Sequence, residues 1–330
     1  SSFYMTVAKL KDKESIKKAV RVWLWSSAFI AFLGLYGYFG IKLGLPMANK
    51  FLIYDLSRIK STFKEPIFYG FYLASVIPLL YSLILNKSYL LPRKYLYGFL
   101  AINLLAMFFT LSRATWVAVI ITIVIISAVN LKFKSVKVKI AAVTVIILIV
   151  IMIASAIFVI SARTATERFE KSVTNIFSGK DFSALARLDA MATAWAIFYE
   201  HPVLGGGFGN YYFLYQKYSP FYEILYTWDE WVHPDANNMY LTVMAESGLL
   251  GLAAVLSIFL TMFINIIKYL RICRDKYWDP FLKGYLGSII FILIIYMFTS
   301  TLMYLFLWVM FGIIFAIQRQ CMLAENTEAE

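Results

Sequence analysis

The chain has few of the charged residues that water-soluble proteins carry on their surface. Only 15% of its 330 residues are charged, whereas 61% are apolar. The apolar residues do not alternate with polar ones but lie in runs that are long enough to cross a bilayer. This pattern excludes a soluble globular protein. It predicts an all-α, polytopic membrane protein.

Cysteine and histidine are also scarce, with two residues of each. We expect Cys273 and Cys321 near the inner ends of spans, where a reducing compartment keeps them as thiols, so no disulfide framework is implied. His233 lies in the one cluster that combines a histidine with several carboxylates. Its spacing matches no established metal template, and we expect no metal site. The carboxylates are Asp229, Glu230 and Asp235.

Signals for nucleotide or nucleic-acid binding are missing. The net charge of +12 is spread over short loops rather than along one stripe, so no nucleic-acid partner is expected. There is no Asp-x-Asp motif and no soluble nucleotide-binding domain, so we expect no nucleotide-sugar donor and no cofactor. The basic N-terminal stretch lacks the short apolar core of a signal peptide. Because the sequence begins without Met, we expect a trimmed or partial chain.

Eight apolar runs have lengths near the ~20 residues that a ~30 Å hydrocarbon core requires. We therefore predict about eight transmembrane helices. The last two runs are short and are interpreted as a hairpin broken at residues 299–301, although one long bent helix would also fit. The runs are Val20–Leu45, Phe68–Leu85, Tyr95–Leu111, Ala114–Leu131, Val138–Ser161, Met239–Ile267, Gly284–Phe298 and Leu302–Ile317.

The cations predict the orientation of these spans. Loops 9–21, 87–94, 132–139 and 268–283 carry most of them and share one side, so the positive-inside rule places both termini in the cytoplasm. We expect a multi-pass protein of the cytoplasmic (inner) membrane. The outward loop 42–65 breaks the rule, and we interpret its excess of cations as functional. These cations are Lys42, Lys50, Arg58, Lys60 and Lys64.

The predicted organisation has three parts: five spans in 1–161, an extracytoplasmic segment in 162–236, and three spans with a cytoplasmic tail in 237–330. The middle segment contains both histidines and nine of the 19 carboxylates, so we expect the chemistry there. Within it, residues 184–200 read as an amphipathic helix lying on the membrane face. Its apolar residues at helical spacing are Leu188, Met191, Ala192, Trp195 and Phe198.

Several outward residues have both a structural and a functional interpretation. Arg113, between two apolar runs, is either a snorkelling interfacial arginine or a bidentate receptor for phosphate oxygens. The glycine-rich turn 201–210 favours a tight re-entry toward the membrane over a nucleotide loop. Ten aromatic residues in 211–231 form either an interfacial belt or a sugar-stacking surface. Glu246, in the first turns of the sixth span, needs a cationic partner or water, and Arg113 is the nearest candidate by depth.

Five segments together resemble the O-antigen ligases, the O-antigen polymerases and their protein-glycosylating relatives, over about residues 50–260. They follow the same order along the chain as in that family, and the third segment includes the Gly205-Gly206-Gly207 turn. The segments are Arg58–Pro66, Ser112-Arg113, Arg187 with Trp195 and His201-Pro202, Asn237–Leu241, and Glu246–Gly251.

The resemblance implies transfer of a glycan from a polyprenyl-pyrophosphate donor to an acceptor hydroxyl at the outer membrane face, without a metal. Arg113 and Arg187 would neutralise the pyrophosphate, and a histidine would accept the proton of the acceptor. The excess of cations in loop 42–65, which an anionic lipid headgroup would explain, also predicts that Arg58, Arg113 and Arg187 converge on one outward cavity. The resemblance further implies that the substrate-binding residues are Arg58, Gly207, Asp235, Asn237, Asn238 and Glu246.

The chain departs from the family at one position. Family members commonly have His-Asn where this sequence has Asn237-Asn238, so the base is either His233 or a carboxylate such as Asp235, or the chain is a polymerase-like member that works differently. Because family ligases usually have more than eight spans, we expect N-terminal helices to be missing. A non-catalytic lipid-linked glycan transporter is the rival class, but Glu246 is essentially the one charge inside a span.

Overall fold

The structure is a computed structural model that describes residues 2–52, 58–130, 182–220, 235–273, 275–300 and 304–326. In these ranges the regular elements are helices, with one isolated bridge between Leu52 and Ile59, which confirms the all-α class. The helices are α1 (Ser2–Lys9), α2 (Lys13–Lys42), η1 (Ala48–Phe51), α3 (Pro66–Leu85), α4 (Arg93–Phe109), α5 (Arg113–Asn130), α7 (Phe182–Glu200), α8 (Tyr211–Tyr218), α10 (Met239–Ile272), η2 (Lys276–Trp278), α11 (Asp279–Ile295) and α12 (Leu305–Asn326).

Seven of the predicted spans coincide with helices of the structure, and the run 138–161 lies outside the described residues. Six helices in the described part of the chain are long and apolar enough to cross a membrane, namely α2, α3, α5, α10, α11 with η2, and α12. The remaining match, α4, has only 17 residues. The protein is therefore a multi-pass membrane protein, while the predicted number of eight spans is not confirmed.

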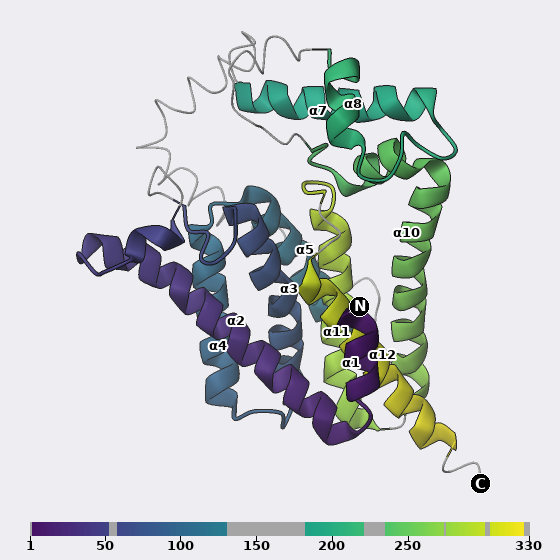
Figure 1. The fold of residues 1–330 in the computed structure, drawn as a ribbon. Helices are drawn as coiled ribbons and strands as arrows, with labels where there is room; N and C mark the ends of the chain where they lie inside the picture. Colours follow the sequence, from purple (N-terminus) through teal and green to yellow (C-terminus); the bar gives the residue numbers. More distant parts are fainter. Residues whose placement is uncertain are drawn as a thin grey trace. The chain divides into compact units, whose positions relative to one another are not determined.

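The chain divides into two compact units, which are described separately. Unit 1 comprises Ser1–Thr144, Thr261–Ile295 and Met303–Glu330, and unit 2 comprises Val145–Leu260 and Tyr296–Leu302. The helices of both are labelled in Figure 1. The division at residues 161 and 236 that the sequence suggested stays a prediction.

Unit 1 is a helical bundle in which α3 is the most buried of the apolar helices. It packs against α4, α5 and α11. Two serine hydroxyls link α3 to α11: Ser82 Oγ donates to Pro280 O and Ser288 Oγ donates to Ser75 O, each at 2.7 Å. Small hydroxyl residues are suited to such contacts because they allow close approach and satisfy polar groups inside a bundle.

Three of the cationic loops lie at one end of unit 1. Lys13 Nζ is 2.5 Å from Asp275 Oδ2, and Arg21 Nε donates to Leu90 O at 3.1 Å. These contacts join loops 9–21, 87–94 and 268–283, as the orientation argument requires, while loop 132–139 lies outside the described residues. The assignment of this end to the cytoplasm stays a prediction.

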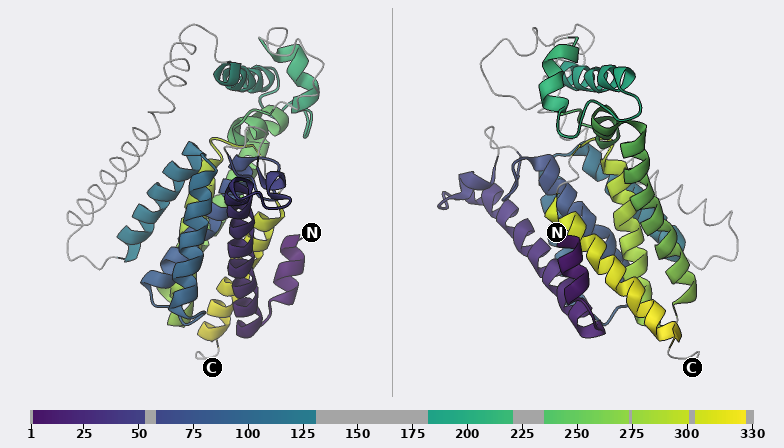
Figure 2. Two further views of the ribbon diagram at one scale, coloured as in Figure 1. Left: turned by 90° about the vertical axis from the view of Figure 1, so that its left-hand side faces the viewer. Right: turned by 45° about the vertical axis from the view of Figure 1, so that its right-hand side comes forward.

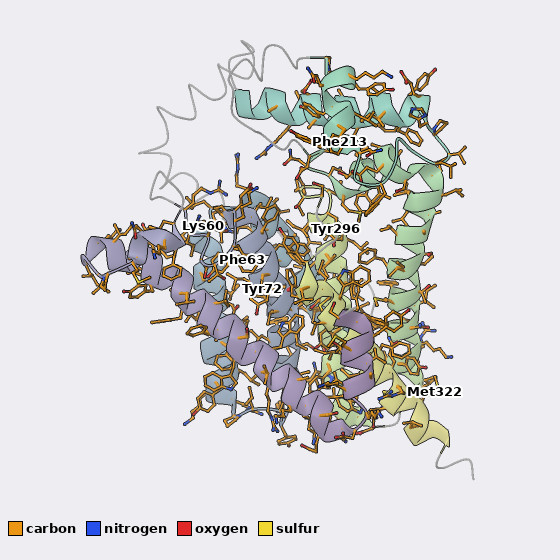
Figure 3. The ribbon with its side chains drawn as sticks, in the orientation of Figure 1. Lys60, Phe63, Tyr72, Phe213, Tyr296 and Met322 are labelled. Atoms are coloured by element: carbon orange, nitrogen blue, oxygen red, sulfur yellow. A yellow bond between two sulfur atoms is a disulfide. The ribbon has the colours of Figure 1, made fainter. Side chains whose placement is uncertain are left out.

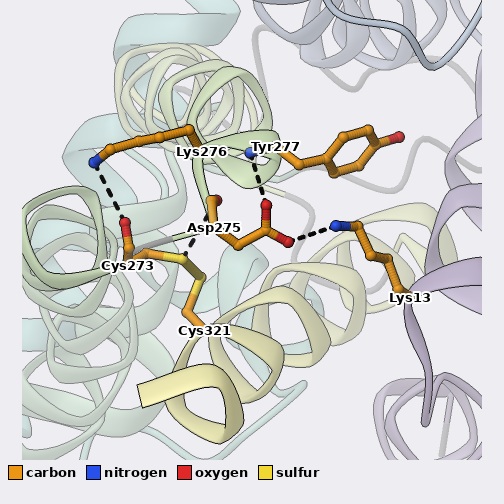
Figure 4. Close-up of a disulfide and its surroundings, with 6 residues drawn as sticks. All are labelled: Lys13, Cys273, Asp275, Lys276, Tyr277 and Cys321. Carbon is orange, nitrogen blue, oxygen red and sulfur yellow. Dashed lines mark hydrogen bonds and ion pairs between the residues drawn. A yellow bond between two sulfur atoms is a disulfide. The ribbon is translucent and has the colours of Figure 1, made fainter. Parts of the chain in front are cut away.

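The two cysteines lie at this same end and form a disulfide, so the prediction of two thiols is wrong. Cys273 follows α10, Cys321 lies in α12, and their Cα atoms are 5.0 Å apart (Figure 4). Lys276 Nζ donates to the backbone oxygen of Cys273 at 3.4 Å. Because α12 ends beside the start of α11, the last two spans form a hairpin and not one long helix. This return of the chain joins cysteines 48 residues apart, which hydropathy does not indicate.

Unit 2 contains α7, α8 and the first part of α10, which appear in teal and green in Figure 2. The helix expected at 184–200 is confirmed as α7, but α8 packs against a face that the apolar pattern did not indicate. Leu188 and Trp195 of the predicted face are exposed. The buried residues of α7 are Asp189, Ala190, Thr193, Ala194 and Ile197.

Candidate functional site

The break between α4 and α5 places Arg113 at the surface of unit 1. Leu111 adopts a left-handed conformation (φ 52°), which reverses the chain within three residues. Trp116 stabilises this reversal, because its Nε1 donates to Met107 O at 3.2 Å and its ring stacks on Phe108. Arg113, the first residue of α5, is exposed. Arg113 therefore belongs to the first turn of a helix, whose amides lack acceptors within the helix.

Arg58 is anchored to the same break. Its Nε donates to Thr110 O at 3.0 Å, and the amide of Ile59 donates to Phe109 O at 3.2 Å. The segment is also held on α3, because the rings of Phe63 and Tyr72 are 5.5 Å apart between centroids (Figure 3). A cation at the carbonyl end of α4 is electrostatically favourable.

Two of the three predicted arginines thus lie at one turn of unit 1. Arg58 is bonded to Thr110, which precedes Arg113 by three residues. Two guanidinium groups and the positive end of α5 make this turn suitable for a phosphate or pyrophosphate group. Arg187 is exposed on α7 and belongs to unit 2. Convergence of all three arginines therefore stays a prediction.

In unit 2, the glycine-rich turn and the Glu246–Gly251 motif form one interlocked structure. The backbone of 202–207 bonds to the backbone of 245–250, where α10 bends at Gly248 (φ 62°, ψ −161°). We call this contact the loop–kink interlock. Its hydrogen bonds are Gly206 N to Ala245 O (2.7 Å), Gly207 N to Glu246 O (2.9 Å), Leu249 N to Pro202 O (2.9 Å) and Leu250 N to Val203 O (3.3 Å).

Two glycines permit this close backbone approach. A Cβ at Gly205 would lie 2.3 Å from the carbonyl carbon of Glu246, and one at Gly248 would lie 2.2 Å from Val203 O. Both residues also have positive φ, which L side chains rarely adopt. The two motifs, about 40 residues apart, are therefore glycine-rich for one shared reason.

Glu246 has a partner other than the arginine that depth suggested. Its Oε1 accepts a hydrogen bond of 3.3 Å from the amide of Tyr211, the first residue of α8. A carboxylate at a helix N-terminus satisfies a free amide and interacts favourably with the helix dipole. The carboxylate is thereby fixed close to Gly207, whose amide donates to the backbone oxygen of Glu246.

The residues around the family's usual histidine position form the turn that starts α10. Asp235 Oδ1 accepts from the amide of Asn237 at 2.7 Å, and Asn237 is left-handed (φ 48°). Asn238 Oδ1 accepts from the amide of Leu241 at 3.2 Å, as an N-cap does. Both asparagines thus have structural contacts. His233 lies outside the described residues.

The aromatic segment is only partly a surface. Tyr211 and Tyr215 are buried in the core of unit 2, so they belong neither to an interfacial belt nor to a stacking surface. Phe213, labelled in Figure 3, is exposed. The aromatics at 221–231 lie outside the described residues.

Asp189 is a buried carboxylate that sequence reasoning missed. It is fully buried on α7, and its two oxygens accept from Ser219 Oγ at 2.8 and 2.7 Å. The hydroxyl of Tyr215 donates to the same carboxylate. These bonds join α7, which carries Arg187, to α8. The one signal in the sequence was a single Asp within an apolar helical pattern. A carboxylate buried at such a position requires hydrogen-bond partners.

The fold and these sites define a multi-pass membrane protein with two arginines at one helix break of unit 1 and the loop–kink interlock in unit 2. A family model described as O-antigen ligase matches residues 96–256. The match includes Arg113, Arg187, the loop–kink interlock and Asn237-Asn238, and it ends before the last two helices. Over this segment the match supports the O-antigen ligase family, as the motifs of the chain predicted. No curated protein matches the chain.

Proposed function

We propose that this member of the O-antigen ligase family transfers a glycan from a polyprenyl-pyrophosphate carrier to an acceptor hydroxyl, at the outer face of the inner membrane. The family match supports a ligase-like glycosyltransferase. The observation that carries the finer proposal is the placement of Arg58 on Thr110, beside Arg113 at the start of α5.

In this reaction the acceptor oxygen forms a bond to the anomeric carbon, and the bond from that carbon to the pyrophosphate breaks. Negative charge then grows on the pyrophosphate. Fixed positive groups are most effective where charge develops in the transition state. Arg58 is held by Thr110 O, and Arg113 is the first residue of α5 three positions later, so we assign both to the leaving group. Arg187, on α7 of unit 2, is proposed as a further catalytic arginine.

The proton of the acceptor hydroxyl needs a base, and two residues remain candidates. The amide of Asn237 bonds to Oδ1 of Asp235, which orients the carboxylate while its second oxygen can take a proton. His233 has the side chain whose ordinary pKa best suits proton transfer near neutral pH. We propose Asn237, Asn238, Glu246 and Gly207 for substrate binding around this base.

Replacing Arg113 by lysine tests the proposal, because lysine keeps the charge but lacks the planar fork that binds two phosphate oxygens. Loss of a preorganised donor of this kind costs ~10²–10³ in rate. Arg93→Lys is the matched control, since Arg93 begins the same helix whose end Arg113 follows. Transfer from purified lipid-linked donor is measured in proteoliposomes. Unchanged transfer by Arg113→Lys contradicts the pyrophosphate role.

A further inference from the structure

The tip of the glycine-rich turn carries an exposed apolar patch. Leu204 and Val203 are 72% and 57% exposed, and Leu249 and Leu250, just beyond the bend of α10, are 52% and 59% exposed. The hydrogen bonds of Leu249 to Pro202 O and of Leu250 to Val203 O hold these aliphatic side chains beside one another. We call Val203, Leu204, Leu249 and Leu250 the tip patch.

The depth of the tip patch in the bilayer can be inferred from the apolar length of α10. Residues 249–267 contain no charged side chain, and Lys268 follows at once. These 19 residues span about 28 Å at 1.5 Å per residue, close to the ~30 Å thickness of the hydrocarbon core. The helix is also the least buried of the six candidate spans. Leu249 and Leu250 therefore mark one hydrocarbon boundary, and their bonds place Val203 and Leu204 at the same depth.

The loop has the properties that entry into hydrocarbon requires. Residues 202–209 carry no charged side chain. Backbone groups in lipid must be satisfied within the protein, and the loop–kink interlock uses the amides of Gly206 and Gly207 and the oxygens of Pro202 and Val203. The amide of Gly205 donates to His201 O at 2.9 Å.

We propose that the tip patch inserts into the bilayer, so that Val203 and Leu204 contact lipid acyl chains next to the start of the membrane-spanning part of α10. The loop is a membrane anchor for unit 2. The ligand is the hydrocarbon of the bilayer, because the patch continues a lipid-spanning helix. The inference does not depend on the proposed glycan transfer.

Site-directed fluorescence quenching tests the insertion. Leu204→Cys is labelled without reductant with an environment-sensitive fluorophore, in proteoliposomes of phosphatidylethanolamine and phosphatidylglycerol, with the unsubstituted protein as the labelling background. Lys217→Cys is the control, because Lys217 is 65% exposed on α8 and pairs with Glu200, a charged pair that stays in water. We expect nitroxide lipids to quench the label at 204 several-fold more than at 217, and aqueous iodide to do the reverse.

A second probe guards against a label that disturbs the loop. Leu249→Cys lies on the same patch but on α10, and we expect the same quenching as at 204. Iodide quenching at 204 equal to that at 217 overturns the proposal. So does a label at 204 that neither quencher reaches, since a second copy of the chain or a bound glycan then covers it. Lipid quenching at 249 with iodide quenching at 204 also overturns the shared depth.

Discussion

Replacing Gly205 by alanine should loosen the loop–kink interlock far more than the same change at Gly209 in the same loop. Both glycines have positive φ, +72° and +76°, so each alanine incurs a similar backbone cost of ~1–2 kcal/mol. At Gly209 nothing lies within 4 Å of the new Cβ, whereas at Gly205 the Cβ meets the carbonyl carbon of Glu246 at 2.3 Å. The loop must therefore move away from α10 only in Gly205→Ala.

The magnitude follows from the bonds that this movement breaks. The amides of Gly206 and Gly207 lose their acceptors Ala245 O and Glu246 O, at 2.7 and 2.9 Å. Each bond contributes ~1 kcal/mol net, so the extra destabilisation is ~2 kcal/mol. This corresponds to a roughly 30-fold larger opening constant, since 1.4 kcal/mol is a factor of ten.

Hydrogen exchange measured in nanodiscs reports this opening directly, because exchange of a bonded amide follows its local opening. We expect the amides of Leu249 and Leu250 to exchange about 30-fold faster in Gly205→Ala than in Gly209→Ala. Equal exchange in the two variants would refute the close approach of the loop and α10.

Three further predictions address the base, the buried carboxylate and the cysteines. The rate of transfer is measured against pH for His233→Ala and Asp235→Asn. The variant that removes the base should lose ~10²–10⁴-fold in rate and the acidic limb of the pH profile. If both variants remain active, neither residue is the base. Tyr215→Phe removes a hydrogen bond to the buried carboxylate of Asp189, whereas Tyr211→Phe removes one to the neutral Ala190 O. Hydrogen bonds to charged groups contribute ~1.5–3 kcal/mol, and those between neutral groups ~1 kcal/mol. Tyr215→Phe should therefore raise hydrogen exchange in α7 by more than Tyr211→Phe. Equal effects would contradict the role of the charge. Denatured protein should bind two maleimide groups only after reduction, and labelling without reductant would contradict the bond between Cys273 and Cys321.

Hydropathy and the order of the motifs were enough to predict the helices and the class of protein. Apolar runs near 20 residues are a local property, because each span must satisfy its own backbone bonds in lipid. Runs such as 68–85 and 239–267 therefore match α3 and α10 closely. The order of short motifs was also enough to indicate the O-antigen ligase family.

Parts of the arginine site were also predictable. The excess of cations in 42–65 indicated that Arg58 had a role, and the short gap between two spans located Arg113. The bond from Arg58 to Thr110 O required the structure, because it joins a loop to a helix end about 50 residues away. Hydropathy contains no information on such pairings.

The contacts between residues far apart in the chain could not be predicted and required the structure. It gave Glu246 the amide of Tyr211 as its partner, and it packed the Asp189 face of α7 against α8 while leaving Leu188 and Trp195 exposed. It also joined Cys273 to Cys321. The physical reason is the same in each case: periodicity records which side chains are apolar, whereas partners depend on where the chain returns and on how closely glycines such as Gly205 and Gly248 let two backbones approach.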